Sequence, residues 1–399
     1  MADTPNMTGA GLLPSGLLPS GLLPAGLSDL MPDQARREAM AITSLMESFG
    51  FFGYSPVDPP LVEFEDTLLA DGPGAALAPD CFRLMDPQSS RMMALRADMT
   101  AQIARIASTR MAHWPRPLRL SYNGAVLRVR GEALNPERQL TQVGAEMIGA
   151  TSPANDAELA VAALMALDRA GVNRLTIDLG VPRLLEAIYG DDIPPAALVE
   201  AVNAKDHALV RDHAADHAAL LSALLDIPLG GVDGLSDGLS KIKSSLPEAA
   251  VAMLAEVLEV AALIRDAMPD VSVTVDPLEQ RGFDYHHGIG FAIFAPGIKG
   301  ELGRGGRYRT ASGNGIGEES TGVTLYLERV LRALPPLRDE DRLYIPFEDG
   351  LNALAGHVRQ DRAAILGTSQ GSEAERLAEA RSLGCSHWLK AGSITPISE

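Results

Sequence analysis

The sequence predicts an α+β fold, an antiparallel sheet flanked by helices, with a helical insertion and a small C-terminal α/β appendage. Three observations predict it. Segments with apolar residues at helical spacing alternate with shorter runs in which apolar and polar residues alternate singly. A stretch rich in Ala and Leu, at about residues 182–267, keeps helical spacing over most of its length. After Pro335, short strand patterns alternate with helical ones.

The composition is that of a large acidic chain. Its 399 residues are 46% hydrophobic, enough for a large core, and their number predicts one large and one small domain. The formal net charge of −18 disfavours nucleic acid as a partner, because a phosphate backbone would gain little long-range attraction. The start lacks the positive charges of a signal peptide, and no apolar stretch reaches membrane-span length without a charged residue. We therefore expect a cytoplasmic protein without a membrane or nucleic-acid partner.

The chain divides into three predicted parts. Residues 1–26 contain GLLPSGLLPSGLLPAGL, a repeat whose regular Pro and Gly exclude a continuous helix and strand pairing, so these residues predict a flexible leader. Residues 27–336 form the main domain, which includes the helical insertion, and residues 337–399 form a truncated α/β domain.

The main domain begins with a helix and an extended segment. Apolar residues recur at helical spacing in Asp33–Phe49, and the Pro-rich stretch YSPVDPPLVEFEDTLL then predicts an extended segment before a second helix. Across Pro117–Gly149, two alternating runs flank a polar loop, which is typical of an antiparallel hairpin. On its second strand Gln142 and Glu146 share a face.

The middle of the chain continues with AELAVAALMALDRAGV as a helix and NRLTIDLG as a strand. Turn residues at GGVDGLSDG predict a break in the helical insertion. Strand patterns resume at VSVTVDPLE and continue through RGFDYHHGIGFAIFAP.

Glycine and apolar patterns assign the remaining elements. The run GELGRGGRY predicts a tight turn between strands, and ESTGVTLYLERVLRAL predicts a helix. In the C-terminal domain, RLYIPF and AAILGT predict strands, and a short strand ends the chain. Ser372 and Glu375 predict a capping box at the start of a helix.

Sparse ionisable groups in apolar or alternating strands are the most informative feature, because a buried charge needs a partner or a ligand. If these groups converge, an arginine suits an α-carboxylate, a carboxylate suits an ammonium group, and Glu146 suits a ring N–H, so the site suits a zwitterionic amino acid. The alternative is a structural ion network in which the groups pair with one another. The candidates are Asp98, Arg128, Gln142, Glu146, Arg281 and Tyr308.

The sequence offers little support for catalysis or a metal. It contains no GxSxG, Walker A or strand-to-helix GxGxxG pattern. Cys81 and Cys385 lie far apart, in no activating or metal-binding motif, and are interpreted as cytosolic thiols. His213 and His217, spaced i,i+4, suit a metal on one helix face, but no third ligand accompanies them and a solvated helix face is preferred. We predict no catalytic residue, no metal and no cofactor.

Four segments together resemble the motifs of class II histidyl-tRNA synthetases, in order and spacing, over roughly residues 23–334. The resemblance implies a class II aminoacyl-tRNA-synthetase-like fold that dimerises through motif 1. The matches are YSPVDPPLVEFEDTLL to motif 1, LRVRGEALNPERQLTQVGAE to motif 2, RGFDYHHGIGF to the histidine-specific motif, and GGRY with TGVTLYLERVLRAL to motif 3.

The resemblance also implies roles for residues around a bound histidine. Asp98 and Thr100 would lie near its α-amino group. Arg128 and Gln142 would lie near its carboxylate, and Glu146 near its imidazole.

Four further residues, Arg281, Tyr285, His286 and Tyr308, would close the pocket by the same resemblance. A regular strand would place Arg281 and Tyr285 on one face and His286 on the other, so His286 ranks lower as a ligand contact.

Departures from the synthetase pattern favour a regulatory relative. Arg130 stands where motif 2 of a synthetase carries a glutamate, and His286 replaces the second of two adjacent tyrosines. The C-terminal part is also too short for an anticodon-binding domain. Arg128 and Arg329, in contrast, match the arginines that synthetases use on ATP.

Long stretches such as FRLMDPQSSRMMALRADMTAQIARIA resemble the family of ATP phosphoribosyltransferase regulatory subunits. Membership implies a non-catalytic subunit that activates a short-form catalytic subunit in the first step of histidine biosynthesis. It also implies feedback inhibition by L-histidine and a homodimer within a larger hetero-oligomer. Two alternatives stay open: a divergent histidyl-tRNA synthetase, and an interaction protein whose pocket is vestigial.

Overall fold

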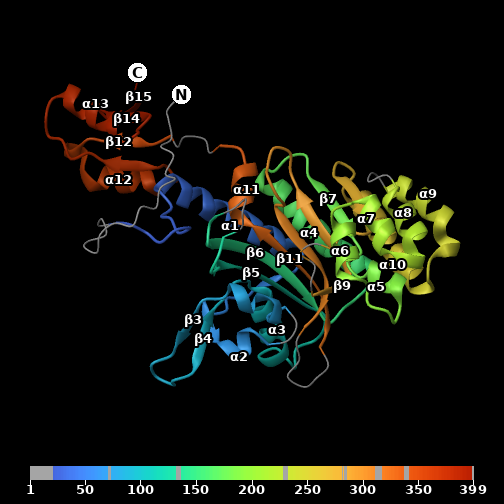
Figure 1. The fold of residues 1–399 in the computed structure, drawn as a ribbon. Helices are drawn as coiled ribbons and strands as arrows, with labels where there is room; N and C mark the ends of the chain where they lie inside the picture. The colour runs from blue at the N-terminus through green and yellow to red at the C-terminus, as the bar shows by residue number, and fades with distance from the viewer. Residues whose placement is uncertain are drawn as a thin grey trace, which may run out of the picture. The chain divides into compact units, whose positions relative to one another are not determined.

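The computed structural model describes residues 21–70, 73–131, 136–227, 232–280, 282, 285–310, 317–336 and 341–397. The chain separates into two compact units after Pro335, and Figure 1 shows the elements of each. Most of the N-terminal repeat lies outside the described residues, so the expected flexible leader stays a prediction. Within the described part of the chain, none of the helices has the length and apolar character of a bilayer span.

The main unit is built on an eight-stranded sheet, and its neighbouring strands are antiparallel except for the outermost pair at each edge. This confirms the α+β fold with a largely antiparallel sheet. In spatial order the strands are β1 (Ser55–Pro56), β5 (Leu118–Leu127), β6 (Gln139–Ile148), β11 (Glu319–Tyr326), β10 (Gly303–Arg309), β9 (His286–Phe294), β7 (Thr176–Gly180) and β8 (Ser272–Asp276).

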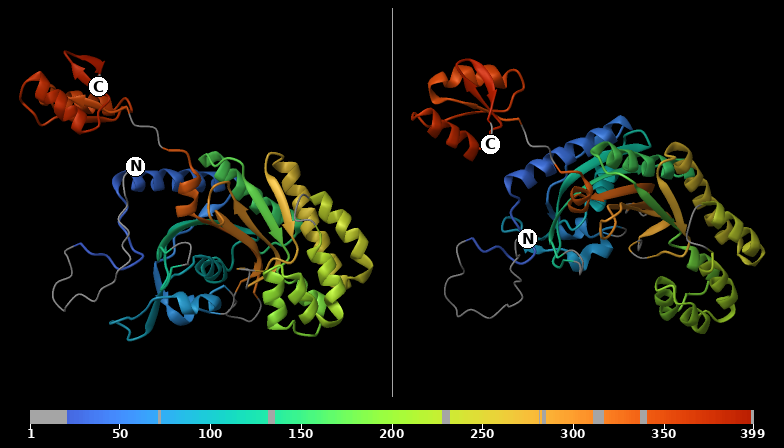
Figure 2. Two further views of the ribbon diagram at one scale, coloured as in Figure 1. Left: turned by 45° about the horizontal axis from the view of Figure 1, so that its top comes forward. Right: turned by 90° about the horizontal axis from the view of Figure 1, so that it is seen from above.

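Helices cover both faces of the sheet (Figures 1 and 2). On one face α1 (Pro32–Phe51), α4 (Pro153–Ala170) and α10 (Glu248–Ala267) pack against the apolar side chains of alternate strand residues. On the other face α3 (Thr100–Thr109) packs against the hairpin of β5 and β6. Next to α3 in Figure 1 are drawn α2 (Glu65–Leu68) and the strands β3 (Arg83–Met85) and β4 (Met92–Leu95). These strands form a small sheet with β2 (Val62–Phe64), in the order β2, β4, β3, and η1 (Ala75–Asp80) lies between α2 and β3 in the sequence.

The predicted hairpin is confirmed, and its side chains alternate between two cores. In β6, Val143, Ala145 and Met147 face the core on α1 and α4. Leu140 and Ile148 face the core on α3. Gln142 and Glu146 share this second face, which is the face that carries the cavity described below.

The helical insertion gathers beside β7 (Figure 1). The helical pattern is broken near GGVDGLSDG as predicted, since one helix ends at Leu225 and the next begins at Val232. Most of this stretch itself lies in the second helix, Val232–Ile242. Gly238 lies within this helix because the packing requires a small residue. A β-carbon at position 238 would lie 2.9 Å from the Ile227 side chain. The insertion comprises α5 (Leu184–Tyr189), α6 (Ala196–Asn203), α7 (His207–His213), η2 (Ala215–His217), α8 (Ala218–Leu225), α9 (Val232–Ile242), η3 (Lys243–Ser245) and α10.

The histidine pair in the insertion does not lie on one helix face. His213 ends α7, and Ala215 has a φ of 47°, which interrupts the helix before His217. The His217 ring packs against Tyr189, with their ring centroids 4.4 Å apart.

Two predictions near the end of the main unit are wrong. GELGRGGRY does not form a tight turn, because Gly303–Arg309 is strand β10, where a β-carbon on Gly305 would lie 2.4 Å from Phe291. ESTGVTLYLERVLRAL is not one helix: Glu319–Tyr326 is strand β11, and only Leu327–Ala333 forms helix α11. The β-branched residues of the first half pair with β6 and β10, and tertiary pairing overrides the helical spacing.

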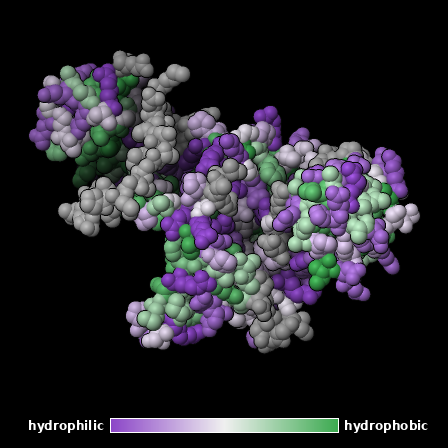
Figure 3. Space-filling model, viewed as in Figure 1, coloured by the Kyte–Doolittle hydropathy of each residue, from purple (hydrophilic) through white to green (hydrophobic). Residues whose placement is uncertain are grey.

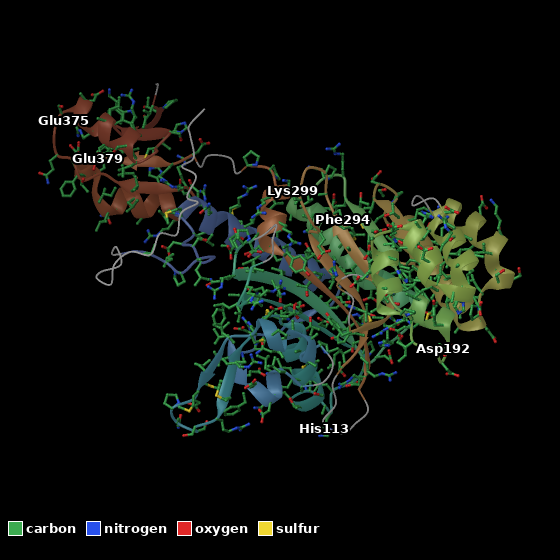
Figure 4. The ribbon with its side chains drawn as sticks, viewed as in Figure 1. His113, Asp192, Phe294, Lys299, Glu375 and Glu379 are labelled. Atoms are coloured by element: carbon green, nitrogen blue, oxygen red, sulfur yellow. The ribbon has the colours of Figure 1, made fainter. Side chains whose placement is uncertain are left out.

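The C-terminal unit contains one four-stranded sheet and two helices within its described residues. The predicted capping box is confirmed, since the Ser372 side chain accepts from the Glu375 backbone N–H and Glu375 accepts from that of Ser372. Figure 4 shows Glu375 and Glu379 in this unit. The elements are β12 (Leu343–Ile345), η4 (Phe347–Asp349), α12 (Gly350–Val358), β13 (Ala364–Leu366), α13 (Glu373–Ser382), β14 (His387–Lys390) and β15 (Ser393–Pro396). One short strand was predicted after α13, and the structure has two.

The surface visible in Figure 3 carries interspersed hydrophilic and hydrophobic residues on the main unit. Because mixed surfaces are normal in proteins, the buried polar groups of the main unit are more informative about function than this surface.

Candidate ligand-binding site

A cavity of about 440 Å³ opens on the α3 side of the main sheet, between β6, β10, β11 and the segment that leads into α3. Its size falls in the range of small-molecule sites. Arg281 lies outside the described residues, and Gln142 is absent from the lining. The predicted site residues that line the cavity are Asp98, Thr100, Arg128, Glu146, Tyr285, His286 and Tyr308.

Glu146 is a carboxylate buried at the cavity, with only 1% of its surface exposed. The Tyr308 hydroxyl donates to its Oε2 at 3.0 Å, and the Tyr122 hydroxyl donates to its Oε1 at 3.3 Å. Burial raises the pKa of Glu146 to about 8, and the charge of Asp98 adds to the rise while the hydrogen bond from Tyr308 opposes it. At neutral pH the empty cavity therefore holds Glu146 as a protonated acid.

Gly322 on β11 gives this carboxyl its space. A β-carbon on Gly322 would lie 1.9 Å from Glu146 Oε2. This role of Gly322 was not predicted, although a glycine within a strand can mark the close approach of another group.

Asp98 is fixed at the start of α3. Its Oδ1 accepts from the Thr100 backbone N–H at 2.8 Å, and its Oδ2 accepts from Gln142 Nε2 at 2.7 Å. Gln142 Oε1 in turn accepts from the Met99 backbone N–H at 3.0 Å. Both ends of the Gln142 amide are thus used within the protein, and Gln142 orients Asp98 from behind the cavity wall.

Three aromatic rings form one wall. Tyr285 and His286 stack with centroids 4.3 Å apart, and Tyr308 lies edge-on to Tyr285 at 5.7 Å. The expectation that His286 faces away is wrong, because the strand begins only at His286 and its register to β10 shifts between Gly306 and Tyr308. Both consecutive side chains therefore line the cavity.

Charged groups occupy another part of the lining. Arg304 donates to Glu301 Oε2 at 2.6 Å, and Arg329 Nη1 donates to the Glu301 carbonyl at 3.1 Å. Arg304 was not predicted as a lining residue, because the segment that contains it, GELGRGGRY, was assigned to a turn. The further lining residues are Pro73, Ala76, Leu77, Asp80, Gly282, Glu301, Arg304, Gly305, Gly322, Thr324 and Tyr326.

The described residues provide acid, base and aromatic groups for recognition. Cys81 and Cys385 are free and buried, and burial raises the pKa of both thiols. Within the described residues no group of three His, Cys, Asp or Glu side chains is arranged to hold a metal ion. The cavity is suited to bind a small zwitterion that presents a ring N–H to Glu146.

The sequence matches one family model and is similar to several curated proteins. The family model described as histidyl-tRNA synthetase matches residues 26–330. An ATP phosphoribosyltransferase regulatory subunit from Rhodospirillum centenum is 43% identical over 403 residues, 100% of both chains. Another, from Gluconobacter oxydans, is 39% identical and covers 99% of each chain.

Solved structures show the same fold. A protein from Bacillus halodurans C, described as an ATP phosphoribosyltransferase regulatory subunit/histidyl-tRNA synthetase, has a TM-score of 0.76 at 21% identity and covers 91% of this chain and 97% of its own. A histidyl-tRNA synthetase from Nostoc sp. PCC 7120 has a TM-score of 0.77 at 17% identity and covers 95% of each chain. The class II aminoacyl-tRNA-synthetase-like fold is thereby confirmed.

Proposed function

The chain belongs to the family of ATP phosphoribosyltransferase regulatory subunits, and we propose that it activates a short-form catalytic subunit and makes that subunit sensitive to L-histidine. In this role the chain performs no chemical step itself. Residues 27–336 bind histidine, and the catalytic subunit carries out phosphoribosyl transfer.

The observation that carries the histidine assignment is the buried Glu146. A carboxyl group enclosed by apolar and aromatic groups is held protonated, and a ligand that brings a ring N–H or a positive ring offsets the cost of ionising it. Imidazole supplies both in one group. The neighbouring rings of Tyr285, His286 and Tyr308 provide flat surfaces for it.

The two other ends of histidine have counterparts in the lining. Asp98, held by Gln142 and the Thr100 backbone, offers a carboxylate to the α-ammonium group. Arg128 offers a guanidinium to the α-carboxylate, and a guanidinium matches a carboxylate with two parallel hydrogen bonds. The three interactions together select a zwitterionic amino acid with a basic ring.

Feedback then follows from linkage. Histidine in the cavity stabilises one arrangement of the complex, so the state of the catalytic subunit must change histidine affinity by the same factor. The usual coupling is about 1–3 kcal/mol. The chain forms a homodimer within a larger hetero-oligomer, an arrangement supported by the motif 1-like segment, and mass measurement in solution tests it.

The deciding experiment measures phosphoribosyl transfer by a short-form catalytic subunit with and without this chain, and then with added histidine. Activation that histidine reverses supports the proposal. The Glu146→Gln variant should weaken inhibition by histidine while the complex still assembles, and Glu158→Gln, on α4 outside the cavity, is its matched control. Unchanged inhibition in Glu146→Gln would refute the site.

The second candidate is a divergent histidyl-tRNA synthetase. The family match over residues 26–330 favours it, as does a cavity with room for more than an amino acid. Histidine-dependent exchange of pyrophosphate into ATP tests this function directly. Partner binding without any heat of histidine binding in calorimetry would instead favour a vestigial pocket.

A further inference from the structure

The N-terminal repeat ends in a turn that contacts Arg138, the residue before strand β6. Leu27 donates its backbone N–H to the Pro24 carbonyl at 3.0 Å, and Gly26 has a φ of +78°. A positive φ at the third residue is the requirement of a type II turn, which glycine meets without strain. We call Pro24–Leu27 the anchor turn.

The anchor turn holds Arg138 at the start of β6. The Arg138 backbone N–H donates to the Gly26 carbonyl at 2.7 Å, and its Nη1 donates to the Ala25 carbonyl at 3.1 Å. The Arg138 guanidinium also lies over the Phe82 ring, 4.9 Å from its centroid. Three separate contacts therefore fix this side chain and backbone.

Arg138 in turn contacts both backbone groups of Arg128. The Arg128 N–H donates to the Arg138 carbonyl at 2.8 Å, and Arg138 Nε donates to the Arg128 carbonyl at 3.3 Å. The regular pairing of β5 with β6 ends one residue earlier, at Leu127 and Gln139. Arg128 thus lies one residue beyond the regular hairpin, is held there by these backbone contacts, and lines the cavity.

A further backbone bond extends the same link to the cavity rim. Val129 donates its N–H to the Asp80 carbonyl at 2.9 Å, and Asp80 lines the cavity. The chain of contacts from Gly26 through Arg138 to Arg128 is continuous and is made by described residues only.

We propose that the anchor turn and Arg138 are a positioning device for Arg128 and set the affinity of the cavity for the carboxylate end of its ligand. The proposal rests on the proposed function, because it takes histidine as the ligand. It gives the last repeat of the N-terminal segment a role in ligand affinity. Arg138 does not line the cavity and acts through Arg128.

Gly26→Ala is the first test variant. A β-carbon there would lie 2.6 Å from the Pro136 carbonyl and 2.8 Å from Arg138, so the anchor turn must move. Gly21→Ala is the matched control from the preceding repeat, since Gly21 also has a positive φ, +97°, but none of the residues that the structure describes lies within 4 Å of its added β-carbon. Arg138→Met is a second variant, which keeps an apolar stem on Phe82 and removes both side-chain donors.

The measurement is calorimetric binding of L-histidine and of L-histidinol, in which a hydroxymethyl group replaces the carboxylate. We expect both test variants to bind histidine about tenfold more weakly, the loss of roughly one charge-assisted contact, and histidinol with unchanged affinity. Gly21→Ala should bind both ligands as the wild type does.

The outcomes separate the two proposals. If the wild type binds histidine and both test variants bind it equally well, the positioning role is refuted and the proposed function stands. An equal loss for histidine and histidinol would indicate general distortion of the cavity and also refutes it. If the wild type binds no histidine, the proposed function itself fails.

Discussion

The two faces of the main sheet each bury a carboxylate, and the two are satisfied in different ways. Asp156 on α4 is 0% exposed and Glu146 on β6 is 1% exposed. Arg307 Nε donates to Asp156 at 3.1 Å, whereas the donors to Glu146 in the described part of the chain are hydroxyl groups. One carboxylate has a cation from the protein, and the other faces a cavity.

Neighbouring residues on two strands produce this difference. On β10, Arg307 contacts Asp156 and the next residue, Tyr308, contacts Glu146. On β11, Thr321 donates to Asp156 and the next residue, Gly322, leaves space for Glu146. Because side chains alternate along a strand, one pair of strands builds a closed ion pair on one face and an open acid site on the other. We infer that the ion pair of Arg307 with Asp156 stabilises the fold, whereas the cavity at Glu146 serves ligand binding.

The largest expected effect comes from breaking the closed pair. Among the described residues, Asp156→Ala leaves the buried Arg307 with only the half-exposed Glu256 as an ion-pair partner, and it should lower the free energy of unfolding by about 3–5 kcal/mol. Glu158→Ala is the matched control on the same helix, because its ion pair with Arg119 is partly exposed and should cost about 1 kcal/mol or less. Urea unfolding followed by circular dichroism measures both. Equal losses of unfolding free energy would show that the buried Arg307–Asp156 pair contributes no more to stability than the exposed Arg119–Glu158 pair.

Glu146→Gln should act in the opposite direction. The folded state holds the Glu146 carboxyl with a pKa of about 8, against 4.5 for an unperturbed glutamate, so the stabilising contribution of its protonated form is complete below about pH 4.5 and is lost as the pH rises through 8. Glutamine does not ionise. The variant should therefore match the wild type near pH 4.5 and exceed it by a few kcal/mol at pH 8, while histidine binding is weakened. A variant that is less stable than the wild type at pH 8 would contradict the raised pKa.

Adjacent substitutions on β11 separate the faces. Thr321→Val removes a hydroxyl that donates to Asp156 and should lower the free energy of unfolding by about 1–3 kcal/mol with histidine affinity retained. Gly322→Ala pushes the Glu146 carboxyl from its place and should weaken histidine binding about tenfold, with a smaller loss of stability because the contact is the end of a side chain. Calorimetry and urea unfolding on each variant give the two readouts. Parallel effects in both variants would show that the faces are coupled.

The sequence was sufficient for elements whose pattern and pairing agree. The hairpin of β5 and β6 alternates clearly, and its face with Gln142 and Glu146 was predicted correctly. Prediction from the sequence failed where pairing between strands decides the conformation, as in β10 and β11. Gly303–Arg309 and Glu319–Tyr326 pair with each other, and no local signal distinguishes such strands from a turn and a helix.

The candidate site follows the same rule. The face of the sheet on which Glu146 lies could be predicted from strand alternation, because β6 is regular. His286 was ranked too low, because the irregular start of β9 cannot be read from strand parity. The roles of Gly322 and Arg307 were not predicted, because they depend on which side chain lies next to each residue in the folded protein. A single sequence does not show these neighbours.

The pH dependence of histidine affinity is the smallest and most specific effect. The free protein keeps Glu146 protonated up to about pH 8, and free imidazole loses its proton near pH 6.5. The complex shares one proton between ring and carboxyl, so binding between these two values moves no proton and affinity should be flat. Below about 6.5 binding must release a proton, and above about 8 it must take one up, so affinity should fall about tenfold per pH unit on either side.

Calorimetry in buffers of different ionisation enthalpy counts the protons directly. The α-amino group of histidine also titrates on the alkaline side, and Glu146→Gln, at high histidine concentration, serves as the control that retains this amino-group effect alone. Affinity that rises up to about pH 8 and then stays constant in the wild type would mean that the ring binds an ionised Glu146 without sharing a proton. In that case the open carboxylate would behave like the closed one, and the contrast between the two faces of the sheet would be one of access and not of charge.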